Sequence, residues 1–228
     1  MEIRGLSYFQ PNGVKALDEI SFRLSNHENL TLLGPNGSGK TTLLLHINGT
    51  LTGSGAVFIE GLPVIPGNLS EIRRSVGIVF QDADEQLFMP TVLEDVMFGP
   101  LNLGMSASEA EVTAKSALTD VGITSDLLQR PPFHLSQGEK RRVALAGVLA
   151  MKPKLLLLDE PTTSLDPPGQ KSLVKLLKTL PQSKIIATHD IHFAAQLSSR
   201  AVFLDRGRLL ADGDLSDIVQ RYGWNPYV

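Results

Sequence analysis

The sequence predicts an α/β fold built on a buried parallel sheet. Three observations support this prediction. A glycine-rich stretch at 34–41 matches the pattern G-x-x-x-x-G-K-[ST] at every fixed position. An apolar run at 30–33 precedes this stretch and a helical pattern at 41–48 follows it. Four consecutive leucines at 155–158 end in two acids, and such uniformly apolar runs are typical of strands buried on both faces.

The composition is that of a globular protein, and we expect one domain spanning residues 1–228. Hydrophobic residues make up 42% of the 228 residues and charged residues 20%. The net charge of −3 gives no overall attraction to nucleic acid, and the absence of cysteine excludes disulfides and thiolate metal sites. We see no signal-peptide pattern and no apolar run approaching the ~20 residues that cross a bilayer. Any link to a membrane is therefore expected to come through a partner.

The first 24 residues predict an N-terminal antiparallel β subdomain. Pro11, Asn12 and Gly13 form a turn signal, and the alternation at 20–24 is typical of a half-buried strand. Tyr8 lies a strand's length before it, followed by Phe9. An aromatic ring here could stack on an adenine or pack at the edge of the core, and the residues leave both interpretations open.

The stretch at 34–41 is predicted to bind the phosphates of ATP. Its glycines let the backbone fold tightly and point N–H groups inward, and the following helix adds the partial positive charge of its N-terminus. Lys40 is expected to reach the β- and γ-phosphates, and the Thr41 hydroxyl is expected to bind Mg²⁺. The predicted phosphate-binding residues are Gly34, Pro35, Asn36, Gly37, Ser38, Gly39, Lys40, Thr41 and Thr42.

Strand-like runs at 56–59 and 76–80 come next, and Gln81 follows the second directly. A polar side chain at the end of a buried strand can bind Mg²⁺ and orient a water, although an isolated glutamine is more often an ordinary loop residue. Beyond it, strand patterns give way to helical ones. We predict a helical subdomain at roughly 82–150, with capping boxes at 106–109 and 136–139.

Asp159 and Glu160 end the leucine strand, where the ligand crevice of an open α/β sheet lies. Asp159 fits the acid that holds Mg²⁺ in nucleotidases with a phosphate loop, and Glu160 is placed to polarise an attacking water. A solvated acid pair at a strand end is the alternative. A further strand at 184–188 ends at His189, which could contact the γ-phosphate or be structural.

Residues 201–211 predict a hairpin and residues 215–222 a terminal helix, followed by an aromatic tail at 224–228 to which we assign no chemistry.

Together these residues resemble the ATP-binding subunits of ATP-binding-cassette (ABC) transporters over essentially the whole chain. Leu135-Ser136-Gln137-Gly138-Glu139 resembles the LSGGQ signature of that family. The other motifs occur in the family's order. They are Gln81 of the Q-loop, Asp159 and Glu160 of the Walker B motif, Ser164-Leu165-Asp166 of the D-loop and His189 of the H-loop. The resemblance implies a P-loop NTPase core with an inserted helical subdomain, and catalytic roles for Lys40, Gln81, Glu160 and His189.

The resemblance also implies a head-to-tail pair of subunits. The signature of one subunit closes over ATP held by the phosphate loop of the other, so Ser136, Gln137, Gly138, Glu139 and Asp166 are expected to contact ATP. Gln137 and Glu139 depart from the family's glycine and glutamine. The aromatic position that stacks on adenine in close relatives is Gln10 here, so Tyr8 is expected to substitute, with Phe9 as the alternative. We expect a homodimer, with a heterodimer as the alternative.

The stretches 79–88 and 143–151 are similar to the energy-coupling-factor class of importers, which take up cobalt, nickel or vitamins. The short chain is similar to cobalt- or nickel-linked members. This resemblance implies integral membrane partners, a peripheral location on the cytoplasmic face of the membrane, and no direct contact with the transported substrate. The alternatives are a vitamin importer, another ABC transporter class, an ABC module that binds ATP without hydrolysing it, or a soluble ABC ATPase acting on DNA or ribosomes.

Overall fold

The computed structural model describes residues 1–224, so most of the aromatic tail expected at 224–228 lies outside the described residues. The N-terminal strands are β1 (Glu2–Phe9), β2 (Lys15–Arg23), β4 (Ser54–Ile59) and β5 (Leu62–Pro63). They form an antiparallel sheet in the order β2-β1-β4-β5. The turn expected at 11–13 joins β1 to β2, and the N-terminal antiparallel sheet predicted from the sequence is confirmed.

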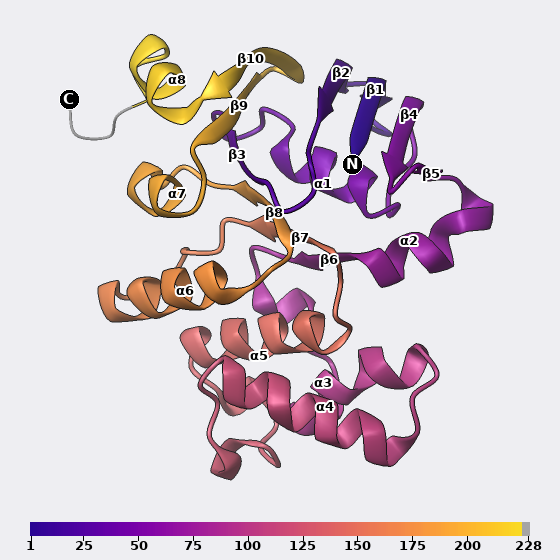
Figure 1. Cartoon of the computed structure of the whole chain (residues 1–228), viewed down its shortest axis with the longest axis vertical. Helices are drawn as coiled ribbons and strands as arrows, with labels where there is room; N and C mark the ends of the chain where they lie inside the picture. The colour runs from indigo at the N-terminus through magenta and orange to yellow at the C-terminus, as the bar shows by residue number, and fades with distance from the viewer. Residues whose placement is uncertain (225–228) are drawn as a thin grey trace.

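A second sheet has the order β10-β9-β3-β8-β7-β6 (Figure 1). Its strands are β3 (Asn29–Leu33), β6 (Val76–Val79), β7 (Leu155–Asp159), β8 (Ser183–Ala187), β9 (Arg200–Asp205) and β10 (Arg208–Asp214). All neighbours are parallel except β9 and β10, which form the predicted hairpin. Its turn residues Arg206 and Gly207 have φ angles of 45° and 77°, the positive values that tight hairpin turns require.

The helices of the parallel sheet cover both of its faces. They are α1 (Lys40–Ile47), α2 (Leu69–Ser75), α6 (Pro167–Thr179), α7 (Ile191–Leu197) and α8 (Leu215–Arg221). The leucines of β7 alternate between two cores. Leu155 and Leu157 pack with α1 and the N-terminal sheet, whereas Leu156 and Leu158 pack with α6 and the helices at the other end of the molecule. This two-sided burial explains why the strand is apolar at every position.

Between β6 and β7 the described chain forms helices and turns only. The helices are α3 (Val92–Asn102), α4 (Ala107–Asp120) and α5 (Gln137–Ala150), which lie together at the lower end of Figure 1. Ser106 and Ser136 each accept a hydrogen bond from the backbone N–H three residues on, and the glutamate there reaches back. Both capping boxes predicted from the sequence are therefore present.

None of the helices within residues 1–224 is both long enough and apolar enough to cross a membrane.

Candidate active site

The loop between β3 and α1 is held tightly against neighbouring backbone. A Cβ on Gly34, whose φ is +145°, would lie 2.1 Å from the Leu204 carbonyl oxygen. A Cβ on Gly39, whose φ is +105°, would lie 2.7 Å from the Ala16 carbonyl oxygen. The Ser38 hydroxyl is buried inside this loop and has no hydrogen-bond partner. A buried hydroxyl without a partner is unfavourable, and a phosphate oxygen is a suitable partner for it.

Lys40 is the first residue of α1 and is 8% exposed. Its ammonium folds back over the loop and donates to the carbonyl oxygens of Gly34, at 2.7 Å, and Pro35, at 3.2 Å. Burial lowers the pKa of Lys40, and the charges of Glu160 and Asp159 act in the opposite direction. A cation in these surroundings is stabilised by an anion at the loop.

Thr41 and Asp159 bring the loop to the carboxyl end of β7. The Thr41 hydroxyl donates to a carboxylate oxygen of Asp159 at 2.6 Å. Asp159 is 3% exposed, and burial raises its pKa. The Thr41 hydrogen bond opposes this shift, and the charge of Glu160 adds to it. Thr41 and Asp159 both offer oxygen atoms, the ligands that Mg²⁺ prefers. A bound cation would also stabilise the charge of the buried Asp159 carboxylate, so these two residues fit a Mg²⁺ site.

Glu160 and His189 meet at the ends of β7 and β8, which are adjacent strands. A carboxylate oxygen of Glu160 lies 2.9 Å from Nδ1 of His189 and accepts from its backbone N–H at 3.4 Å. The Glu160 side chain is 8% exposed, whereas the His189 side chain is 66% exposed. The imidazole therefore reaches outward from a carboxylate that is almost buried, in an arrangement that can exchange a proton with an attacking water.

Gln81 follows β6, the neighbour of β7, and its backbone carbonyl accepts from a guanidinium nitrogen of Arg141 at 2.6 Å. Arg141 was not among the residues predicted from the sequence. In the run of three basic residues at 140–142, Lys140 and Arg141 are 8% and 9% exposed. Helical periodicity was the available signal, since it places residue 141 on the same face as the apolar residues 144, 145 and 148.

The signature residues lie apart from the phosphate loop of the same chain. In the part of the chain that the structure describes, no hydrogen bond joins 136–139 to 34–41. Helices α1 and α5 pack into different cores on opposite faces of the sheet (Figure 1). The Ser136 hydroxyl donates to Glu139 at 2.7 Å, and this interaction, together with the backbone N–H of Ser136, lowers the pKa of Glu139. Gln137 donates to Asp84 at 3.4 Å.

Asp166 is the N-cap of α6, and its carboxylate accepts a hydrogen bond from the Gly169 N–H at 2.8 Å. Tyr8 is half-buried and packs with the core of the N-terminal sheet, with its ring 4.7 Å from the ring of His46 in an edge-on arrangement. Phe9 is 60% exposed. Of the two aromatic residues considered for adenine stacking, Phe9 has the exposed ring, with the Lys15 ammonium 5.7 Å from its centroid, whereas the ring of Tyr8 packs in the core.

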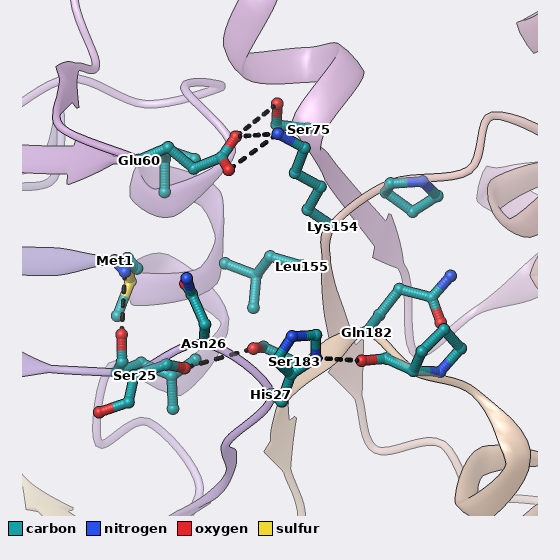
Figure 2. Close-up of a pocket in the computed structure, with 14 residues that line it drawn as sticks. Met1, Ser25, Asn26, His27, Glu60, Ser75, Lys154, Leu155, Gln182 and Ser183 are labelled. Atoms are coloured by element: carbon teal, nitrogen blue, oxygen red, sulfur yellow. Dashed lines mark hydrogen bonds and ion pairs between the residues drawn. The ribbon is translucent and has the colours of Figure 1, made fainter.

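A separate cavity of about 340 Å³, lined by both polar and apolar residues, lies near the amino ends of β7 and β8 (Figure 2). Lys154 and Glu60, which both line it, form an ion pair at 2.8 Å, and Nδ1 of His27 is hydrogen-bonded to the Pro181 carbonyl oxygen at 3.0 Å. None of the site residues predicted from the sequence lines this cavity. The candidate active site is therefore the loop at 34–41 together with the carboxyl ends of β6, β7 and β8.

Residues 17–163 match a family model described as ABC transporter. The chain is 50% identical over 214 residues to the cobalt import ATP-binding protein CbiO of Rhodobacter capsulatus, covering 91% of this chain and 76% of that protein. It is 45% identical over 225 residues to the energy-coupling factor transporter ATP-binding protein EcfA of Carboxydothermus hydrogenoformans, covering 97% and 83%. The solved structure of cbiO1 from Clostridium perfringens, part of the transporter complex cbiONQ, has a TM-score of 0.84 at 37% identity, covering 97% and 90%.

Proposed function

Because the chain belongs to the ABC transporter family of ATP-binding subunits and is an ATPase, we propose that it powers an energy-coupling-factor importer of cobalt or nickel ions. The main support for ATP hydrolysis at this site is a pair of contacts at adjacent strand ends. Thr41 forms a hydrogen bond with Asp159, and Glu160 contacts Nδ1 of His189. The similarity to CbiO and EcfA supports the choice of importer class.

In the proposed mechanism, the loop at 34–39 and Lys40 bind the phosphates of ATP. The ammonium of Lys40 exchanges its bonds to loop carbonyls for bonds to phosphate oxygens, and the Ser38 hydroxyl gains a partner. Phe9 or Tyr8 is the candidate for stacking on the adenine. Because the loop is already packed against the carbonyls of Leu204 and Ala16, it needs little reorganisation to receive the phosphates.

Thr41, Asp159 and Gln81 are the proposed Mg²⁺ ligands, since all three offer oxygen donors at one edge of the sheet. Bound Mg²⁺ would neutralise charge on the phosphates. Glu160 accepts a proton from the attacking water. His189 is oriented by Glu160 through Nδ1, so its exposed Nε2 is the nitrogen available to the γ-phosphate.

A second copy of the chain is proposed to complete the site. Helix α5 packs into the core on the face of the sheet opposite α1, and within residues 1–224 no hydrogen bond joins 136–139 to the phosphate loop. These two observations support a role in which Ser136, Gln137, Gly138 and Glu139 contact ATP held by another subunit. The N-terminus of α5 would then supply N–H donors to the γ-phosphate, and Asp166 would lie near the same interface. We propose a homodimer bound to integral membrane subunits at the cytoplasmic face of the membrane, where the ATPase does not touch the cargo.

Uptake measurements test the cargo. Cells that express the chain with its neighbouring membrane subunits would be assayed for cobalt, nickel and biotin uptake, with Glu160→Gln as the inactive control. We expect metal uptake that the control loses. Biotin uptake alone would move the assignment to a vitamin importer, and ATP hydrolysis without uptake of any of the three would place the chain in another transporter class.

A groove of about 390 Å³ is the proposed docking site for a cytoplasmic helix of the membrane subunit. It lies between α2, α3 and α5, with Arg73 and Arg74 on one side. Phe88 and Phe98 pack edge-on at 4.9 Å and remain 64% and 42% exposed. Asp95 fixes the segment before α3 by accepting from the backbone N–H groups of Phe88 and Met89. An exposed aromatic pair on an anchored segment suits the apolar face of a helix.

Phe88→Ser is therefore expected to uncouple transport from ATP hydrolysis. Loss of an aromatic anchor costs about 2 kcal/mol of binding or more, so the variant should co-purify poorly with the membrane subunits while the free chain hydrolyses ATP at the wild-type rate. Val112→Ser is the control, since Val112 is 68% exposed on α4 and does not line the groove. Equal recovery of the two variants in the membrane complex would remove Phe88 from the docking surface.

A further inference from the structure

Arg141 connects three of the motifs described above. It belongs to α5, five residues after Ser136 of the signature. One guanidinium nitrogen donates to the backbone carbonyl of Glu160 at 2.7 Å, and the other donates to the backbone carbonyl of Gln81 at 2.6 Å. A single side chain therefore ties the helix that carries the signature to the two residues that follow β6 and β7.

The surroundings of Arg141 are costly for a cation. The residue is 9% exposed, and no carboxylate within residues 1–224 forms an ion pair with it. Burial lowers the pKa of its guanidinium, and only the more distant charges of Asp82 and Glu160 oppose this shift. A buried charge held by two carbonyls is weak evidence for a stability role. The planar fork of arginine does, however, fix two acceptors at a set spacing.

The backbone of Glu160 needs such support. Its φ is 43°, in the left-handed region that is uncommon for residues other than glycine. Its N–H donates to the Ala187 carbonyl at 2.8 Å, and its own carbonyl accepts from the Thr163 N–H at 3.1 Å as well as from Arg141. The direction of the Glu160 carboxylate depends on this conformation being kept.

The segment after β6 is attached to the same face of α5 at other points. Lys140 pairs with Asp84 at 2.6 Å, and the Gln86 amide donates to the Ala144 carbonyl at 3.4 Å. Any movement of α5 is therefore transmitted to the Q-loop by several contacts. Among these contacts, Arg141 alone continues to Glu160.

We propose that Arg141 is a positioning residue for ATP hydrolysis, which keeps Glu160 and Gln81 at a fixed spacing and couples both to the position of the signature helix. This inference rests on the proposed function, since it concerns the geometry of the same site. In this proposal Arg141 acts through the two carbonyls that its guanidinium holds, and not by direct contact with ATP or Mg²⁺. It is expected to affect the turnover step and not ATP binding, because within residues 1–224 its side-chain hydrogen bonds go to the carbonyls of Glu160 and Gln81 and not to the phosphate loop.

The test compares Arg141→Met with Lys184→Met in the purified full chain. Lys184 is a matched control, since it is also a buried cation, 2% exposed, and donates only to two carbonyls, those of Leu180 and Gln182. It lies at the amino end of β8, away from the site. We expect Arg141→Met to lower kcat about 100-fold, the effect of misplacing a catalytic group, with KM for ATP unchanged. Lys184→Met is expected to lose stability but keep kcat.

Two further measurements separate positioning from folding. In a Glu160→Gln background, Arg141→Met should cost much less than in wild type, because Arg141 acts through Glu160. If Arg141→Met does not fold, Arg141→Lys, which keeps the charge but not the fork, should have an intermediate kcat at wild-type KM. Wild-type kcat in either folded variant, or full additivity with Glu160→Gln, would overturn the proposal. Absence of Mg-ATP turnover in the wild-type chain would instead defeat the proposed function.

Discussion

Replacing Glu160 by glutamine is expected to lower ATP turnover about 10²–10⁴-fold, the usual contribution of a general base, while ATP binding is retained. Glutamine matches the size of glutamate and can still accept a hydrogen bond from Nδ1 of His189, so the orientation of the imidazole is kept. It cannot accept a proton from water. Within residues 1–224, Glu160 forms hydrogen bonds with Ala187 of β8, His189, Arg141 and Thr163, and none with the phosphate loop.

The measurement is steady-state hydrolysis of Mg-ATP, together with equilibrium binding of ATP. Glu60→Gln is a matched control, because Glu60 is also a glutamate in the left-handed region, with a φ of 51°. It pairs with Lys154 at the cavity in Figure 2, away from the active site. The control should turn over ATP like wild type. If Glu160→Gln did so too, Glu160 would not be the base.

The same variant probes the proposed dimer. ATP that binds but is not hydrolysed should hold two chains together, so Glu160→Gln should run as a dimer in size-exclusion chromatography with Mg-ATP and as a monomer with ADP. A variant that binds ATP and remains a monomer at every concentration would contradict closure of the signature over the nucleotide of a second copy.

Much of this site could be predicted because its local parts are encoded in short stretches. The phosphate loop carries its own glycines, and the leucines of β7 report burial on both faces. Ser106 and Ser136, each followed three residues later by a glutamate, predict the starts of two helices. In each case the residues that determine the local structure are close neighbours in the sequence.

The contacts that join these parts were not predictable in the same way. Thr41 and Asp159 are 118 residues apart in sequence, and Arg141 and Gln81 are 60 apart. Hydrophobic periodicity does not specify which strands are neighbours, and the order β3-β8-β7-β6 is what brings these residues together. The basic run at 140–142 has the composition of a solvated helix face, yet Lys140 and Arg141 are buried where α5 packs against β6 and the segment that follows it.

Tyr8 illustrates a different limit. The sequence identified an aromatic pair at the end of a strand but could not say which ring packs inward. Side chains alternate between the two faces of a strand, and the register of β1 with β2 places Tyr8 opposite Leu17, on the core side. Its ring then meets His46 of α1, whereas Phe9 remains exposed. The stacking residue depends on this register, which the sequence alone left open.

Gly34→Ala is expected to cause the other large effect, a loss of both stability and ATP binding. The positive φ of Gly34 costs an alanine about 1–2 kcal/mol, and the added methyl carbon must displace the Leu204 carbonyl at 2.1 Å or the loop itself, for about 1–3 kcal/mol more. Leu204 lies in β9, which pairs with β3. Neither strand can yield without disturbing the parallel sheet, so we expect the phosphate loop to move instead.

Gly61→Ala separates the cost of the positive φ from the cost of the steric contact. Gly61 has a φ of +82° in the turn between β4 and β5, and its added Cβ would meet no atom within 4 Å. This variant should lose only the roughly 1–2 kcal/mol of the left-handed conformation and should bind ATP normally. Urea unfolding and ATP binding would be measured on both variants. If they lost equal stability and bound ATP equally, the packing of the loop against β9 would not determine its shape. A larger loss in Gly34→Ala would mean that the last strands of the chain set the geometry of a loop near its start.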